Sequence, residues 1–240
     1  MNAIPPEQSS SYASKNYKTT VLQLISGKAG AEVLEIGGGR SPLLEAKDLP
    51  PDVASYTIND ISQKELDLAP QGFEKLCFDV CGDVDWIEQR FDVAFSKMLA
   101  EHVPDGRKFH GNILKLLKPG GIGFHFMPIL YAPPFVINKL LPEDLSRRVL
   151  QAFFPKRNDD GIPKFPAHYS MCFGRSEKLI GLYKSIGYED VDIRVFYGHD
   201  YFRKIPVIRE LDDLLTRTAC RFQISQLAAY AYVKAVKPRD

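Results

Sequence analysis

Cysteine is scarce in this 240-residue sequence, and the four cysteines do not form a recognisable motif. Cys77, Cys81, Cys172 and Cys220 include no C-x-x-C pair, and none stands beside a histidine at zinc-finger spacing. This pattern argues against a structural zinc site and against a thioredoxin-like redox motif. We therefore expect four reduced cysteines with structural roles.

The sequence also lacks long hydrophobic runs and any large excess of charge. No stretch of about 18 apolar residues occurs, and the first 18 residues, MNAIPPEQSSSYASKNYK, lack the apolar segment of a secretory signal. We therefore expect a cytoplasmic protein with no membrane span. Lys+Arg 31 against Asp+Glu 30 leaves a net charge of +1, so the strong positive field that long nucleic acids require is absent.

Short apolar runs alternate with helix-like segments, the pattern that builds a parallel sheet flanked by helices. The length and this pattern predict a single domain over residues 1–240. We expect strands at 31–36, 54–58, 75–78, 91–95, 122–127, 191–197 and 227–236, and helices at 111–117, 176–185 and 207–218. Residues 118–121 (KPGG) are expected to form a turn before the fifth strand.

Two segments fall outside this alternation. Residues 129–166 are rich in proline and aromatic residues and are expected to form an inserted cap over the substrate site, with an amphipathic helix at 143–154. Residues 1–30 are expected to form an N-terminal lid or helix, and a mobile tail is the alternative.

A run of glycines follows the first predicted strand. In residues 33–41 (VLEIGGGRS), Glu35 precedes Gly37, Gly38 and Gly39. Glycine lets the backbone turn sharply and lets a ligand lie against it, and the turn leaves free N–H groups. A glycine-rich turn of an unrelated α/β protein is the alternative interpretation.

Two further strands end in acidic residues. Asn59 and Asp60 end the second strand, 25 residues after Glu35, and Asp79 with Val80 ends the third. A carboxylate at the first spacing can accept both hydroxyl protons of a ribose. Each acid could instead serve as a helix cap or a turn residue.

Taken in order, VLEIGGGRS, TINDIS, FDV, FDVAFSKMLAEHV and LLKPGG resemble the motifs of class I S-adenosylmethionine-dependent methyltransferases of the small-molecule type. The resemblance covers about residues 31–127. It implies a Rossmann-like three-layer α/β sandwich with a seven-stranded, mostly parallel sheet whose last strand is antiparallel. It also implies S-adenosylmethionine as the cofactor.

The resemblance assigns cofactor-binding roles to particular residues. Glu35 and the turn Gly37, Gly38 and Gly39 would hold the methionine part, Asp60 with its neighbour Asn59 the ribose, and Asp79 with Val80 the adenine, while Ser96 and Lys97 would line the methionine side. The methyl group would then point into the space under the cap.

Transfer to a hydroxyl requires a base, and the five histidines are the candidates. His125, in the fifth strand, and His102, after the fourth, are favoured, and His168 could approach from the cap. His199 is a weaker candidate, and His110 is expected to face solvent. Only Glu101 lies near this edge as a further acid, so no metal is predicted.

We expect methyl transfer to a small-molecule hydroxyl, on a sugar, a lipid-linked intermediate or a secondary metabolite. N- or C-methylation and a non-enzymatic binding subunit are the alternatives. A nicotinamide oxidoreductase is disfavoured because Pro42 stands where a dinucleotide site needs its third glycine. The Asn/Asp-Pro-Pro-aromatic motif of nucleic-acid-base enzymes is absent at Ser96–Leu99, so the partners expected are a small-molecule substrate without nucleic acid, with a homodimer left open.

Overall fold

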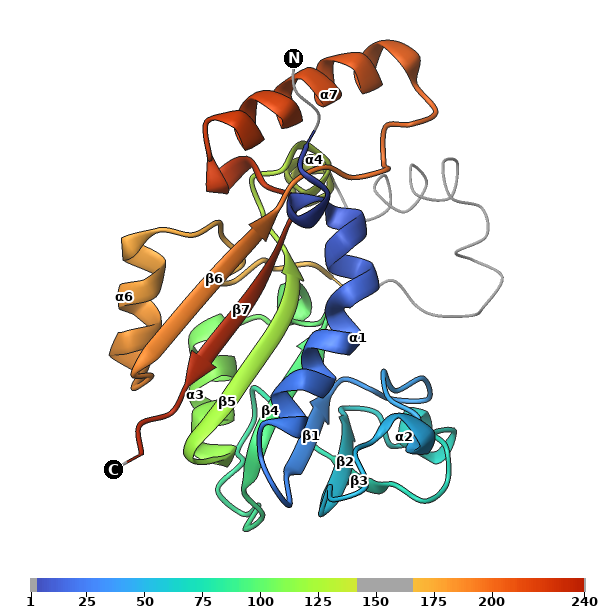
Figure 1. Cartoon of the computed structure of the whole chain (residues 1–240), viewed down its shortest axis with the longest axis vertical. Coiled ribbons are helices and arrows are strands. Elements are labelled where there is room, and N and C mark those ends of the chain that lie inside the picture. The colour runs from blue at the N-terminus through green and yellow to red at the C-terminus, as the bar shows by residue number, and fades with distance from the viewer. Residues whose placement is uncertain (1–3, 142–165, 240) are drawn as a thin grey trace.

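A computed structural model describes residues 4–141 and 166–239, and it shows one sheet between two layers of helices (Figure 1). The strands are β1 (Glu32–Ile36), β2 (Ser55–Asp60), β3 (Glu74–Cys77), β4 (Phe91–Lys97), β5 (Leu117–Pro128), β6 (Asp190–Phe196) and β7 (Tyr230–Val236). The α-helices are α1 (Ser10–Ser26), α2 (Gln63–Asp67), α3 (Gly106–Leu116), α4 (Pro133–Leu140), α6 (Glu177–Ile186) and α7 (Pro206–Arg221).

The strand order β3-β2-β1-β4-β5-β7-β6 confirms the predicted seven-stranded sheet. Strands β1 to β5 pair in parallel, and β7 lies between β5 and β6, antiparallel to both. The chain leaves β1 in one direction to reach β2 and β3 and returns on its other side at β4. Ligands of open α/β sheets bind where the strand order reverses in this way, beyond the carboxyl ends of the strands.

The sheet buries a separate apolar core on each face. On one face α1 packs its buried residues Ala13, Tyr17, Val21 and Ile25, which recur every four residues, against the sheet. On the other face α3 and α6 cover a second cluster. Residues of β5 alternate between the two, so Phe124 and Phe126 join the first core.

Helix α1 is fixed to the sheet through Tyr17. Its hydroxyl donates to Ser96 O (2.7 Å) and lies 3.1 Å from Phe124 O, and its ring stacks on Phe124. A mobile tail therefore does not describe residues 10–26. The start of α1 lies at the carboxyl end of the parallel strands (Figure 1).

Residues 118–121 belong to β5, whereas the sequence predicted a turn. Phe91 pairs with Leu117 and Val93 with Ile122, so the register shifts at this point and β5 accommodates Pro119 and two glycines as an irregularity. Within the expected cap, α4 is the described helix, and the helix expected at 143–154 lies outside the described residues.

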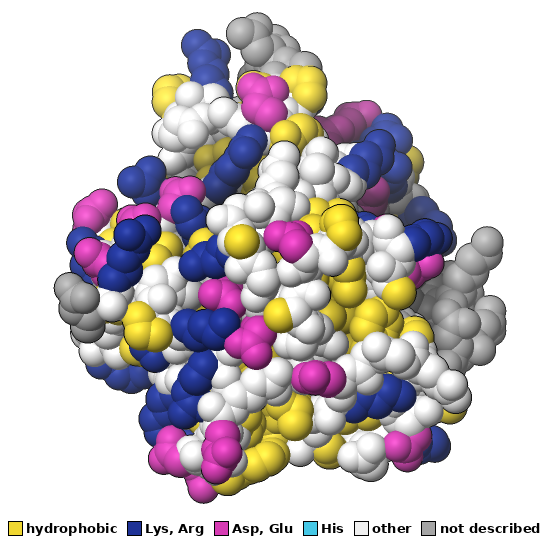
Figure 2. Space-filling view, turned by 60° about the horizontal axis from the view of Figure 1, so that its bottom comes forward, with side chains coloured by type: hydrophobic (Ala, Val, Ile, Leu, Met, Phe, Trp, Pro, Cys, Tyr) yellow, Lys and Arg dark blue, Asp and Glu magenta, His cyan; other side chains and the backbone are white. Residues whose placement is uncertain are grey.

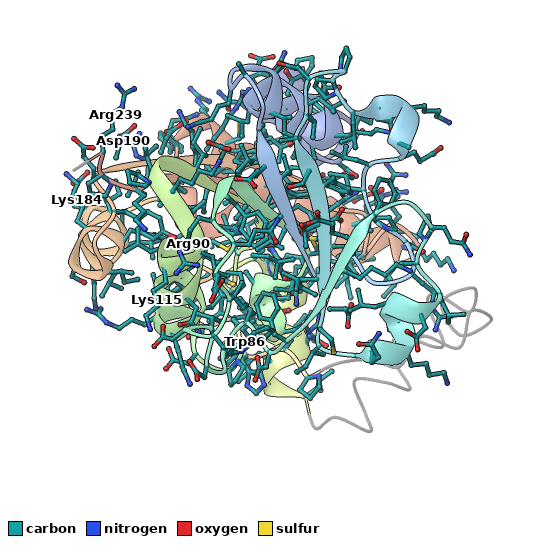
Figure 3. All side chains as sticks on the ribbon, turned by 90° about the horizontal axis from the view of Figure 1, so that it is seen from below. Trp86, Arg90, Lys115, Lys184, Asp190 and Arg239 are labelled. Carbon is teal, nitrogen blue, oxygen red and sulfur yellow. The ribbon has the colours of Figure 1, made fainter. Side chains whose placement is uncertain are left out.

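The opposite edge of the sheet carries mixed charges. Seen from that edge, Arg90 lies just before β4, while Asp190 and Arg239 lie at the near ends of β6 and β7 (Figure 3). Lysine and arginine side chains alternate there with aspartate and glutamate, and no histidine is visible on this face (Figure 2). None of the described helices is both long and apolar enough to cross a bilayer.

Candidate functional site

The glycine turn after β1 is held by backbone hydrogen bonds from β2. Gly37 N and Gly38 N both donate to Asn59 O, at 2.9 and 3.0 Å. Gly37 has φ +74° and Gly39 has φ +46°, conformations that side chains disfavour. A Cβ on Gly37 would also overlap Leu99 Cδ1. The turn therefore brings bare backbone to the carboxyl edge of the sheet.

Glu35 lies beneath this turn and is 5% exposed. Its carboxylate accepts from Leu43 N (3.0 Å) and from the hydroxyl of Tyr56. Burial raises the pKa of Glu35 to about 7, although the Tyr56 hydrogen bond, the Leu43 amide and the charge of Lys97 all oppose the rise. Glu35 thus orders the loop that follows the turn.

Asp60, at the end of β2, lies directly beside the turn. Its Oδ1 accepts from Ser62 N (2.9 Å), and a Cβ on Gly39 would lie 2.7 Å from Oδ2. Half-burial raises the pKa of Asp60, and the Ser62 amide partly opposes this effect. One carboxylate oxygen therefore borders the space that glycine leaves open.

The Asn59 side chain is held within the sheet by hydrogen bonds to β3 and the loop after it. Asn59 is 2% exposed, and its side chain donates to Leu76 O and Phe78 O, each at 3.0 Å. The side chain therefore ties β2 to β3, while the Asn59 carbonyl accepts from the glycine turn.

Asp79 and Val80 form the loop after β3. Asp79 is exposed, and its Oδ1 accepts from Cys81 N (2.8 Å), while Val80 is 7% exposed. Sequence reasoning missed Asn112, on α3, whose Nδ2 donates to Val80 O (2.8 Å) and Gly82 O (2.9 Å). An isolated asparagine within a predicted helix gave no signal of this contact, which shapes the wall expected to face adenine.

At the end of β4, Ser96 and Lys97 point to opposite faces of the sheet. Ser96 is fully buried, with its Oγ 2.9 Å from His125 Nδ1, and its carbonyl accepts from Tyr17. Lys97 is exposed on the α1 face. Met98 follows with φ +53°, and its N–H donates to Phe126 O (2.7 Å), so the chain turns sharply at this edge.

A cavity of about 630 Å³ adjoins the end of β4 on the α1 side. Its wall comes from four regions: the first turns of α1, the end of β4, strands β5 and β7, and the loop after β6. The lining residues are Ser10, Ser11, Ser14, Lys15, Lys97, Met98, Phe126, His199, Asp200, Tyr201, Arg203 and Tyr230. A cavity of this size and mixed polarity suits a small organic molecule.

His125 does not reach this cavity. It is fully buried on the α3 side of β5, where it packs against Phe109 and His110, and burial lowers its pKa to about 3. His110 is buried as well, with Nε2 2.8 Å from the Tyr183 hydroxyl, so the expectation that it faces solvent is wrong. The apolar face of α3 carries the His110 ring into the core, where it packs on the His125 ring of β5.

His102 is the last residue of the short 3-10 helix Ala100–His102, and His168 lies beside this helix. His102 Nδ1 is 2.9 Å from Pro166 O, and the His168 N–H donates to Glu101 O (2.7 Å). Glu101 is 4% exposed, its Oε2 has no hydrogen bond, and burial raises its pKa to about 8. None of these three residues lines the cavity.

His199 is the histidine that lines the cavity. Its side chain is 1% exposed, Nε2 lies 3.2 Å from Asp212 Oδ1 on α7, and Nδ1 has no hydrogen bond. Within the described ranges 4–141 and 166–239, no group of three or more His, Cys, Asp or Glu residues is arranged to hold a metal ion.

Comparison with known proteins agrees with this geometry. Residues 34–124 match a family described as "Methyltransferase domain". Over 98 residues the chain is 35% identical to a ubiquinone biosynthesis O-methyltransferase of Coxiella burnetii, covering 38% of this chain and 41% of the relative. Over 125 residues it is 27% identical to 24-methylenesterol C-methyltransferase 3 of Arabidopsis thaliana, covering 49% of this chain and 34% of the relative. The matched region thus covers 41% or less of the length of these relatives.

Solved structures share the fold. A phosphoethanolamine N-methyltransferase 2 of Haemonchus contortus, in complex with S-adenosylhomocysteine, superposes with a TM-score of 0.56 at 17% identity, over 93% of this chain and 52% of the other. The N-methyltransferase NodS of Bradyrhizobium japonicum superposes with a TM-score of 0.52 at 15% identity, over 99% and 93%. Residues 34–124 thus resemble a methyltransferase domain, and the described fold is the one that these solved structures share.

Proposed function

We propose that the protein transfers a methyl group from S-adenosylmethionine to a small-molecule acceptor bound in the cavity beside the end of β4. The observation that carries this proposal is the convergence of the glycine turn, Asp60 and Asp79 at one edge of the sheet, next to that cavity. These residues come from three different strands, and each strand ends where the ligand of an open α/β sheet binds.

The residues fit the cofactor by shape and by charge. The bare backbone of the glycine turn admits a methionine chain, and Asp60 Oδ2 can accept ribose hydroxyl protons. The Val80 side chain would pack on an adenine ring, beside the Asp79 carboxylate. S-adenosylmethionine supplies a methyl group on a sulfonium, which is already a good leaving group, so the protein mainly has to align the acceptor and accept its proton.

For the acceptor atom we propose a hydroxyl, the class favoured from the sequence. A ubiquinone biosynthesis O-methyltransferase among the relatives supports this choice, and a sterol C-methyltransferase among them keeps carbon methylation as the second candidate. His199 is placed to take the hydroxyl proton because it lines the cavity, with Asp212 beside its other nitrogen. His125 is a poor base because the core encloses it, and His102 and His168 lie outside the cavity wall.

Calorimetric titration tests the proposed function. S-adenosylmethionine and S-adenosylhomocysteine should bind the purified protein at micromolar concentration, and NADH, the control, should not. Binding of NADH alone, or of none of the three, would contradict the proposal. Analysis of methylated products then distinguishes oxygen from carbon or nitrogen as the acceptor atom.

A further inference from the structure

The cavity carries an excess of positive charge. Lys15, Lys97 and Arg203 line it, and its single carboxylate, Asp200, pairs with Arg203 (Nε–Oδ1 2.8 Å). In the described part of the chain, no carboxylate lies within 4 Å of the ammonium of Lys15 or Lys97. Two lysines therefore face this space with their charge unneutralised at short range.

The first turns of α1 add to this positive character. Ser10, Ser11 and Ser14 present hydroxyls to the cavity, and the first turn of this 17-residue helix contains no acidic residue. The amino end of a helix has a partial positive charge, which favours an anion nearby. An acidic residue would normally neutralise such a helix end, and here none does.

A buried polar atom at the cavity wall also lacks a partner. His199 is 1% exposed at its side chain, and its Nδ1 makes no hydrogen bond. The charged groups around it are Asp212, Asp213 and Arg209 from α7 and Asp200 and Arg203 from its own loop. Buried nitrogens without a partner are rare in folded proteins, and a catalytic role or a bound water or ion accounts for such exceptions.

We propose that this cavity binds a methyl acceptor bearing an anionic group, a carboxylate or a phosphate, which Lys15, Lys97 and the first turn of α1 hold. This inference rests on the proposed function and specifies its substrate class. The opposite wall is apolar, with Met98, Phe126 and Tyr230, and receives the carbon frame of the acceptor. The site therefore selects amphiphilic anions over neutral molecules of the same shape.

Titration of the protein saturated with S-adenosylhomocysteine tests this inference. The probes are benzoate, phenyl phosphate and the neutral benzyl alcohol. At least one anion should bind at millimolar concentration or below, more tightly than the alcohol, and its affinity should fall as ionic strength rises. A preference for benzoate or for phenyl phosphate identifies the carboxylate or the phosphate as the anchoring group.

Two charge reversals provide the matched comparison. Lys15→Glu, at an exposed position of α1, should weaken anion binding by about tenfold, the product of a lost attraction and a new repulsion. Lys178→Glu, at an exposed position of α6 on the other face of the sheet, should leave it unchanged. Both variants should keep the S-adenosylhomocysteine affinity of the original chain.

Three results would overturn the inference: no anion binding, equal binding of the alcohol, or anion affinity unchanged in Lys15→Glu. In each case, retained S-adenosylhomocysteine binding leaves the proposed function standing. Loss of nucleotide binding by the original chain would instead refute the proposed function itself, so the two failures are distinguishable.

Discussion

Asp60 is the residue whose side chain supports the cofactor site most directly. It borders the glycine turn with one carboxylate oxygen, and a hydrogen bond to a charged acceptor is worth roughly 1.5–3 kcal/mol. We expect Asp60→Ala to weaken S-adenosylhomocysteine binding by about tenfold or more, as measured by calorimetry.

Asp60→Asn separates the charge from the shape of this side chain. It keeps an oxygen for Ser62 N and should recover part of the affinity. Thermal unfolding of both variants checks that the sheet is intact. Affinity in Asp60→Ala equal to that of the original chain would remove the ribose assignment.

Gly37 offers a test of the glycine turn that has its own control. Gly37 (φ +74°) and Gly30 (φ +61°) both have left-handed backbones, but a Cβ on Gly37 would overlap Leu99, whereas one on Gly30 meets nothing within 4 Å. Alanine at either position should cost about 1 kcal/mol of stability from the backbone alone. Only Gly37→Ala should also abolish nucleotide binding, as calorimetry would show. Equal nucleotide affinity in the two variants would contradict the proposed role of the turn.

At the scale of elements, α1 joins the core to the cavity. Tyr17 anchors it through Ser96 O and Phe124 O, within two turns of the serines that line the cavity. Tyr17→Phe removes both contacts from a fully buried site and should lower the free energy of unfolding by about 1–2 kcal/mol, measured by denaturant titration. Tyr12→Phe, on the same helix but partly exposed, is the control and should change stability little. An equal effect of the two substitutions would show that the Tyr17 hydroxyl does not anchor α1.

The strands and their ends were predictable from the sequence. The spacing of apolar residues, and the glycine or acidic residues that follow them, are signals carried by neighbouring positions in the chain. Glu35, Gly37 and Asp60 are recognisable from a strand that ends in an acid or a glycine, and the structure places them at one edge. The irregular start of β5 was not predictable. Pro119 and Gly120 favour a turn locally, and only pairing with β4 draws them into the strand.

The sequence could not show which histidines reach the cavity, because it does not fix the direction of their side chains. The strand that contains His125 was predictable, but the sequence does not identify which helix covers each face of that strand. The burial of His125 beneath α3 therefore could not be predicted. His199 reaches the cavity because the loop after β6 returns over the carboxyl edge, a long-range feature. Asn112, which supports the loop after β3, depends in the same way on packing between distant segments.

At the scale of the whole molecule, buried carboxyls make stability depend on pH. Burial raises the pKa of Glu101 from its ordinary 4.5 to about 8. The folded state therefore holds this proton at pH values where the unfolded state has released it. The stability that this group contributes is full below pH 4.5 and is lost as pH rises towards 8.

Glu101→Gln should remove this dependence. We expect the variant to gain about 1–3 kcal/mol of stability relative to the original chain at pH 8, and much less at pH 5, in denaturant titrations at both values. Glu88→Gln, at an exposed glutamate, should show no such difference. A gain of the same size at both pH values would indicate a packing effect and contradict the titration.

The two edges of the sheet, at the carboxyl and the amino ends of its parallel strands, carry different kinds of residues. The carboxyl edge of the sheet holds the glycine turn, the acids and the positive cavity, while the opposite edge carries interspersed charges of both signs (Figures 2 and 3). We propose that the cofactor lies at the carboxyl edge with its sulfur towards the cavity.

A crystal structure of the complex with S-adenosylhomocysteine tests that claim most directly. We predict the ribose hydroxyls at Asp60, the adenine beside Val80, and the sulfur near Lys97, facing the cavity lined by His199. Nucleotide bound elsewhere, or bound with its sulfur directed away from that cavity, would contradict this account.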